Sequence, residues 1–208
     1  MRRSRTRPAL RASAALLAST ALLALSAAVP ATAAAKTHRL GTGTATFDLI
    51  PTETGVFLHA GVPPYPIFPS RMSWTTTSTT LHMPVSGGTW TTGTGAHGTF
   101  VLGGGLAFVD PDSTTPFDIL DLTHWRIGIG TTGAISVSAN GTRTPNFFDV
   151  KPPLSSIVTI HGHRFVKVIV GGLFFNATSV GAISVAIGSS PANPGDPFAV
   201  GVLLARLK

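Results

Sequence analysis

The sequence contains no cysteine, one tyrosine and a single glutamate among its 208 residues. The missing cysteine excludes disulfide bonds, thiolate metal sites and thiol nucleophiles. Glutamate and lysine are scarce while threonine, glycine and valine are abundant, a composition that disfavours helices and favours strands. The composition therefore predicts a β-rich fold that is stable without covalent cross-links.

Basic residues are concentrated at the start of the chain. Five arginines lie within the first eleven residues, an apolar stretch follows, and Ala33-Ala34-Ala35 forms a small-residue cleavage site before Lys36. The apolar run is shorter than the roughly 18 residues expected of a membrane span. We therefore expect residues 1–35 to be a secretory signal peptide. Residues 36–208 are expected to form a single β-rich domain, secreted, extracellular or associated with the cell envelope, with no transmembrane span after signal removal.

The charge that remains after removal of this segment is small. Ten basic side chains face eight acidic ones, and the basic residues are scattered along the chain. Proteins that bind nucleic acid carry a clustered basic footprint. The sequence therefore favours an extracellular or envelope ligand, of unknown identity, over nucleic acid.

Short segments rich in β-branched and aromatic residues alternate with turn residues, a spacing typical of a sandwich or barrel. Pro51 and Gly61 suit the first turn and the cap of a short helix over residues 51–60. The proline-rich run 61–70 predicts an extended connection, and Pro84 predicts an edge strand at best over 81–85. Other strands are expected at 44–50, 99–102, 106–110, 118–129, 134–139, 156–161, 165–170, 182–188 and 200–207. The expected fold class is all-β, a mainly antiparallel β-sandwich or partly closed barrel with one short N-terminal helix.

The glycine-rich segment 93–130 raises the question of a phosphate-binding loop. Such a loop needs its glycines between a strand and a helix, whereas "LGGGLAF" runs into another strand. We therefore interpret these glycines as hairpin or bulge positions. In the strand that follows, His124 and Arg126 are expected to face away from the core. The odd-numbered residues are expected to face it: Phe117, Ile119, Trp125, Ile127 and Ile129.

Two places in the sequence could hold a metal ion. His161 and His163 are two residues apart, and on a strand both imidazoles would lie on one face. A third ligand has to come from elsewhere, so two polar residues on the exposed face or at the end of a strand remain the other interpretation. The turn with Asp110, Asp112 and Asp118 offers oxygen ligands but lacks the glycine and glutamate of an EF-hand. We expect no metal site.

Sequence motifs for catalysis are absent. The chain has no G-x-S-x-G, S-x-x-K or H-E-x-x-H motif, and no spacing pairs its aspartates. The sequence therefore predicts a non-catalytic binding or structural module rather than an enzyme. A secreted hydrolase stays as a further alternative, and it requires two aspartates, or a serine and a histidine, within hydrogen-bond reach in a cleft.

A family resemblance covers residues 84–141. The runs "PVSGGTWTTGTGAHGTFVLGGGLAF", "FDILDLTHWRIGIG" and "TTGAISVSANG" resemble the HtaA-type domain of bacterial exported haem-uptake proteins. The resemblance implies a β-rich, surface-exposed domain. Haem-binding members are similar in having a tyrosine ligand from an N-terminal aromatic segment and a histidine after the Gly-Gly-x-x-Phe strand. Here the positions after Phe108 read Val109-Asp110-Pro111, with no histidine.

A haem- or metal-binding carrier is therefore the alternative to a binding or structural module. Tyrosinate is a known haem ligand, and Tyr65 is the only tyrosine. Haem is the cofactor that the resemblance raises, although no motif of the chain demands a cofactor. The candidate ligand-binding residues are Tyr65, His161, His163, His124 and Arg126.

Overall fold

The computed structural model describes residues 34–109, 119–130, 133–151, 153–188 and 190–208. Residues 1–33 of the predicted signal peptide and Phe117 lie outside these residues. All described elements belong to one compact unit, Thr32–Lys208. Its strands are β1 Lys36–Leu49, β2 Pro64–Ile67, β3 Arg71–Trp74, β4 Thr79–Thr92, β5 His97–Leu102, β6 Gly105–Val109, β7 Ile119–Ile129, β8 Gly133–Ala139, β9 Thr142–Val150, β10 Leu154–Ile160, β11 His163–Phe175 and β12 Pro197–Leu207.

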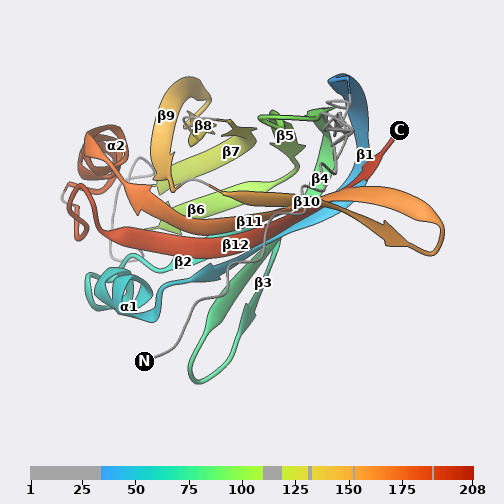
Figure 1. Ribbon diagram of the computed structural model, residues 1–208. Coiled ribbons are helices and arrows are strands. Elements are labelled where there is room, and N and C mark those ends of the chain that lie inside the picture. Colours follow the sequence, from blue (N-terminus) through green and yellow to red (C-terminus); the bar gives the residue numbers. More distant parts are fainter. Residues whose placement is uncertain (1–33, 110–118, 131–132, 152, 189) are drawn as a thin grey trace, which may run out of the picture. The chain divides into compact units, whose positions relative to one another are not determined.

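Eight of these strands form a closed antiparallel barrel (Figure 1). The order around it is β7, β5, β4, β1, β12, β11, β9 and β8, and pairing of β8 with β7 completes the circuit. The other four strands extend it, because β6 and β2 continue outward from β7, β3 pairs with β4, and β10 pairs with β11. The expected all-β class is confirmed, and the structure selects the barrel over the sandwich and closes it.

The barrel interior is filled with large apolar side chains. Trp125 is fully buried, with ring centroids 6.3 Å from Phe47 and 5.7 Å from Phe148. Phe148 stacks on Phe198 at 4.9 Å. Aromatic pairs of this kind add to the stability that burial provides. The packed interior contributes to stability, which leaves the outer surface as the place for a ligand.

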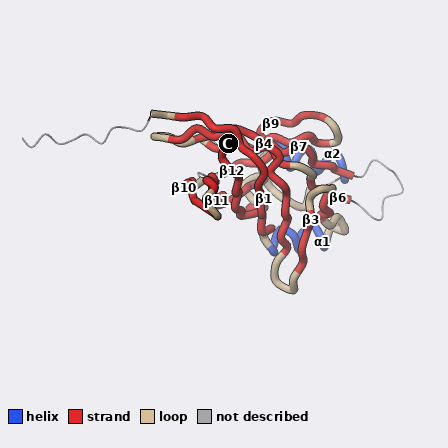
Figure 2. Tube along the Cα trace, turned by 90° about the vertical axis from the view of Figure 1, so that its right-hand side faces the viewer, coloured by secondary structure: helices blue, strands red, loops and turns tan. Residues whose placement is uncertain are grey.

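The described residues contain two helices beside the barrel, one more than expected. Helix α1, Pro51–His59, confirms the predicted helix, and its Phe57 packs 5.8 Å from Phe175. Helix α2, Ala177–Ile187, occupies a segment in which a strand was predicted at 182–188, and that prediction is wrong. Figures 1 and 2 show both helices as short elements outside the strands. No helix in the described part of the chain has the length and apolar character needed to cross a membrane.

Capping explains why α2 forms despite its β-branched residues. The Asn176 side chain accepts hydrogen bonds from the backbone N–H groups of Thr178 and Ser179, at 2.9 and 3.1 Å. The Ser179 hydroxyl in turn accepts from the Asn176 N–H at 2.8 Å. Gly188 closes the helix with a φ of 76°. These caps satisfy the backbone groups that a helix end leaves unpaired, and they outweigh a modest strand propensity.

Replacing Asn176 with alanine is expected to lower the free energy of unfolding by about 1 kcal/mol, the usual effect of losing an N-cap. Urea-induced unfolding followed by circular dichroism measures the change. Thr178→Ala is the control, since Thr178 is an exposed residue of the same helical turn. Equal midpoints for Asn176→Ala and Thr178→Ala would contradict the capping role.

Prolines are placed in the sheet differently from the prediction. β4 is not an edge strand, because it pairs with β1 on one side and with β3 and β5 on the other. Pro84 falls between the last β3 pair, at His82, and the first β5 pair, at Val85. The Pro84 carbonyl accepts a hydrogen bond of 2.8 Å from the Gly103 N–H. Since the nitrogen and carbonyl of a strand residue point to the same side, the Pro84 nitrogen, which has no hydrogen to donate, faces the gap between the β3 and β5 pairings. The run 61–70 likewise contains a strand, β2, which tolerates two prolines because it pairs on one side with β6.

Candidate functional site

The outer surface of β7 carries a β-bulge. The register between β7 and β8 shifts between Thr123 and Arg126, and His124 has a φ of 51°. Positive φ is uncommon for a residue other than glycine, and bulges often re-aim side chains beside functional sites. Before the bulge the buried residues are even-numbered, and after it they are odd-numbered. They are Leu120, Leu122, Trp125, Ile127 and Ile129.

This change of parity corrects one prediction and confirms others. Ile119 is 37% exposed instead of facing the core, because it precedes the bulge. Trp125 and the odd-numbered residues after it are buried as expected, and His124 and Arg126 are exposed. The bulge therefore turns the side chains of neighbouring residues, Thr123 and His124, to the same outer surface.

The buried indole of Trp125 holds the bulge in place. Its Nε1 donates a hydrogen bond of 2.8 Å to the Leu122 carbonyl. The Leu122 carbonyl lies on the edge of β7 that faces β6, because a Cβ added to Gly105 would lie against it, while the backbone groups of Asp121 face Asn140 on the other edge. The indole therefore ties the backbone just before the bulge to the residue just after it.

The glycines that follow β5 lie opposite the bulge. On this edge β7 pairs first with β6 and then with β5, and Gly103 and Gly104 connect these two strands. Gly104 has a φ of 78°, and a Cβ there would overlap Ser70. The Ser70 hydroxyl accepts from the Gly105 N–H at 2.9 Å and donates to the Gly103 carbonyl at 3.3 Å. The glycines therefore form a kinked strand connection, as the bulge interpretation predicted.

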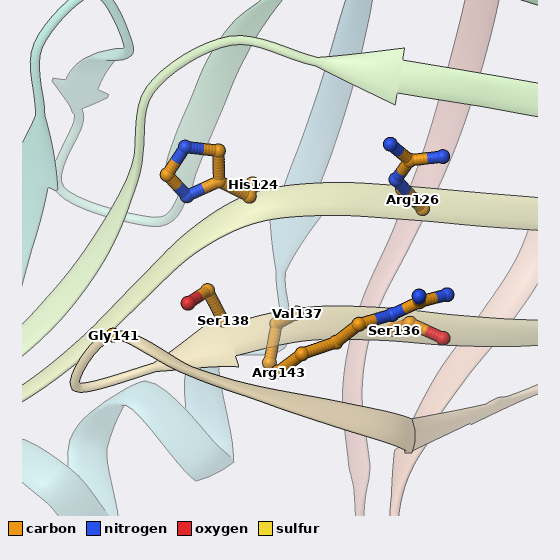
Figure 3. Close-up of a pocket in the computed structure, with 7 residues that line it drawn as sticks. All are labelled: His124, Arg126, Ser136, Val137, Ser138, Gly141 and Arg143. Carbon is orange, nitrogen blue, oxygen red and sulfur yellow. The ribbon is translucent and has the colours of Figure 1, made fainter.

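Two adjoining hollows meet at His124 and Arg126, which line both of them. The first, here called the polar hollow, has a volume of about 220 Å³ (Figure 3). The second, here called the apolar hollow, has a volume of about 350 Å³. The polar hollow is otherwise lined by Ser136, Val137, Ser138, Gly141 and Arg143. The apolar hollow is otherwise lined by Ile67, Phe68, Ser86, Val101, Leu102, Gly103, Gly104 and Thr123.

The polar hollow carries positive charge without a compensating carboxylate. Arg126 and Arg143 come from β7 and β9, and no acidic residue of the described chain lines the hollow. Among the described residues, neither guanidinium has a hydrogen-bond or ion-pair partner. Figure 3 shows the Arg143 side chain running alongside β8 toward Ser136. Guanidinium groups bind carboxylates and phosphates well, so the hollow suits a ligand with anionic groups.

His124 is arranged to act as a ligand through one ring nitrogen. Its Nδ1 lies 3.0 Å from the Thr123 hydroxyl. A hydrogen bond at one nitrogen fixes the orientation of an imidazole and leaves the other nitrogen free to bind a metal. The Nε2 atom of His124 is therefore the one available at the junction of the two hollows.

The other predicted residues lie elsewhere. Tyr65 is 48% exposed and, by strand alternation, shares the outer face of β2 with Ile67, but it lines neither hollow. His161 occupies the turn between β10 and β11 with a φ of 47°, and His163 opens β11. The same-face arrangement on one strand is therefore absent, and Arg206 donates to His163 Nδ1 at 3.0 Å.

No cluster of three or more histidine or acidic side chains suited to a metal ion occurs in the part of the chain that the structure describes. Asp110, Asp112 and Asp118, the predicted oxygen ligands, lie outside that part. One serine–histidine pair bears on the hydrolase alternative, since Ser73 Oγ lies 3.4 Å from His82 Nε2. The other nitrogen of His82 faces the Thr46 hydroxyl at 3.5 Å instead of a carboxylate, and the pair is exposed and lines neither hollow.

No protein-family model and no curated protein sequence matches the chain. Among solved structures, it is similar to the haem-binding protein HtaB from Corynebacterium glutamicum, with a TM-score of 0.50 and 13% identity over 84% of this chain and 97% of HtaB. The C-terminal domain of HtaA from the same organism has a TM-score of 0.47 and 10% identity, over 81% of this chain and 99% of that domain. The resemblance to HtaA-type domains seen in the sequence is thus confirmed for the fold, and this chain has the fold of HtaB.

Proposed function

We propose that the protein is a non-catalytic carrier that binds haem on the outer surface of its barrel, where the polar and apolar hollows meet at His124. The single observation that carries the proposal is this junction. One imidazole with a free nitrogen stands between an apolar surface and two guanidinium groups that have no partner among the described residues. The sequence alternative of a haem carrier is therefore favoured over a structural module without a ligand.

The apolar hollow suits a flat hydrophobic ring. Phe68 is 87% exposed, and it lies with Ile67, Val101 and Leu102 along the hollow. Large aromatic side chains that stay exposed in the free protein gain stability when a ligand covers them. The volume of the apolar hollow, about 350 Å³, lies within the range of roughly 300–1,000 Å³ typical of small-molecule sites.

The polar hollow suits the remaining chemistry of haem. Haem, when bound, would supply an iron centre that takes a nitrogen ligand, and its two propionate groups would supply carboxylates. His124 offers the nitrogen ligand, oriented by Thr123, while Arg126 and Arg143 match the carboxylates. Tyr65 is on the outer surface of the same sheet but outside both hollows, so we assign it no ligand role.

The comparison and the sequence support the same proposal. HtaB, whose fold this chain shares, is a haem-binding protein. The signal peptide expected from the sequence supports a location outside the cytoplasm, secreted or at the cell envelope. We propose that haem is acquired there.

An absorption titration with haemin tests the proposal. The wild-type chain is expected to give a saturable Soret shift at one equivalent, and His124→Ala to abolish that shift. Replacing either Arg126 or Arg143 with alanine is expected to weaken binding by about tenfold to 100-fold, because a hydrogen bond to a charged group contributes about 1.5–3 kcal/mol. Protoporphyrin IX without iron separates the two roles, since its binding depends on the arginines and is indifferent to His124.

Controls come from residues of the same type outside the hollows. His82→Ala and Arg71→Ala remove an exposed histidine and an exposed arginine from other strands and should leave the titration unchanged. Tyr65→Phe and the double replacement of His161 and His163 with alanine are also expected to bind normally. A flat wild-type titration would retire the proposal, and loss of the shift in Tyr65→Phe but not in His124→Ala would reassign the iron ligand.

A further inference from the structure

The outer face of β10, β11 and β12 combines exposed apolar side chains with positive charge. Strand alternation and register place Leu154, Ile169 and Val202 in one row across the three strands. They are 72%, 43% and 37% exposed. The alternate residues of β11 point inward and are fully buried: Val166, Val168 and Val170. The apolar row therefore faces solvent, with no partner among the described residues.

Cations flank this row, and acids do not. Lys167 and Arg206 project from β11 and β12 on the same face, next to the exposed Ile160 at the end of β10. The three strands together contain no aspartate or glutamate. The neighbouring strand, β1, contains one acidic residue, Asp48. It pairs with Val200 near the start of β12, away from Arg206 at the other end of that strand. We call the surface formed by Leu154, Ile160, Ile169, Val202, Lys167 and Arg206 the apolar-basic face.

The β10–β11 hairpin, which bears four of the six residues of this face, projects from the barrel (Figure 1). β10 pairs only with β11 among the described strands, and six of its seven residues are exposed. It contains no proline or charged residue, the devices by which proteins usually protect an edge strand. Because the hairpin projects from the barrel, the apolar side chains of β10 can be reached by a large, flat binding partner.

We propose that the apolar-basic face docks on an anionic lipid bilayer. Lysine and arginine near such a surface are attracted by its negative potential, and apolar side chains between them gain by entering the interface. A soluble polyanion would use the cations and leave the apolar row exposed. A second copy of the chain, paired through the same face, would bring Lys167 and Arg206 close to their own counterparts and repel them. The proposal does not depend on haem.

Co-sedimentation with lipid vesicles tests the docking. The chain from Lys36, which contains every described strand and helix, is mixed without haem with vesicles of phosphatidylcholine alone or with about 30% phosphatidylglycerol, a strongly anionic surface. Binding is expected only to the anionic vesicles and is expected to weaken in high salt. The double variant Lys167→Glu and Arg206→Glu should bind at least about tenfold more weakly, because each cation near the surface contributes about fivefold. Leu154→Ser with Ile169→Ser should also bind more weakly.

Arg71→Glu is the matched control, since it reverses an exposed arginine on β3 and should leave binding unchanged. Circular dichroism confirms that each variant is folded. Equal binding to both kinds of vesicle, no binding to either, or a serine variant that binds as the wild type does would overturn the proposal. So would heparin binding as tight as vesicle binding, or a dimer that the serine variants convert to a monomer.

Discussion

Replacing Trp125 with alanine is expected to lower the free energy of unfolding by about 4 kcal/mol, since removing a buried tryptophan costs roughly 3–5 kcal/mol. The indole is fully buried against Phe47 and Phe148 at the centre of the barrel. The variant also loses the hydrogen bond to the Leu122 carbonyl, so the bulge that presents His124 loses its support. Denaturant unfolding measures the first effect and the haemin titration the second.

Trp125→Phe separates packing from the hydrogen bond. Phenylalanine keeps most of the aromatic contact but has no N–H, so the hydrogen bond to the Leu122 carbonyl is lost. The expected cost is about 2 kcal/mol, from a lost hydrogen bond worth about 1 kcal/mol and a modest loss of volume. If haemin affinity falls in Trp125→Phe while the protein remains folded, the indole positions His124. Unchanged affinity would limit Trp125 to a packing role.

Gly104→Ala is expected to destabilise the protein by about 3 kcal/mol, because alanine at a positive φ costs about 1 kcal/mol and overpacking adds roughly 1–3 kcal/mol. The added Cβ would overlap the Ser70 side chain and lies 2.5 Å from its backbone nitrogen. Since Ser70 fastens the β5–β6 connection, the substitution should also disturb the apolar hollow. Thermal unfolding and the haemin titration report the two effects.

Gly162→Ala is a matched control for this prediction. Gly162 has a φ of 77°, nearly the same as Gly104, but no described atom lies within 4 Å of the position that an added methyl group would take. The cost of positive φ is therefore shared by the two variants, and the difference between them measures the collision with Ser70. Equal melting temperatures for the two variants would show that the β5–β6 connection can shift to accommodate the added methyl group with no loss of stability.

The strands of this barrel could be predicted from the sequence where apolar and polar residues alternate regularly. The prediction failed where the backbone geometry interrupts this alternation. The sequence located the second half of β1 and most of β12, whereas the first half of β1 and the whole of β9 were not predicted. The parity of β7 changes at His124, and the sequence carries the signal, since a single odd-numbered phase would turn Asp121 and Thr123 inward while Leu120 and Leu122 are the apolar residues there. α2 was missed because its valines and isoleucines favour strands, while the determining contacts are caps at Asn176 and Gly188.

The candidate site was predictable in part. His124 and Arg126 were singled out because they share a strand with a tryptophan of opposite orientation. Phe68 could not be placed beside them, because it follows β2, which reaches β7 only through the pairing of β2 with β6 and of β6 with β7. The hairpin turn "NGT" was a signal that Arg143 lies across from β8, and Ser138 is indeed its partner.

The position of β1 between β4 and β12 sets an order on folding. β1 can pair with β4 as soon as residues 79–92 have been synthesised, but its other edge pairs with residues 199–207. Contacts of such high sequence separation form slowly, since the entropy of closing a long loop opposes them. Throughout synthesis one edge of the first strand is thus without its native neighbour. The barrel therefore cannot close before β12 has been synthesised, and until then the folding of β1 depends on its pairing with β4 alone.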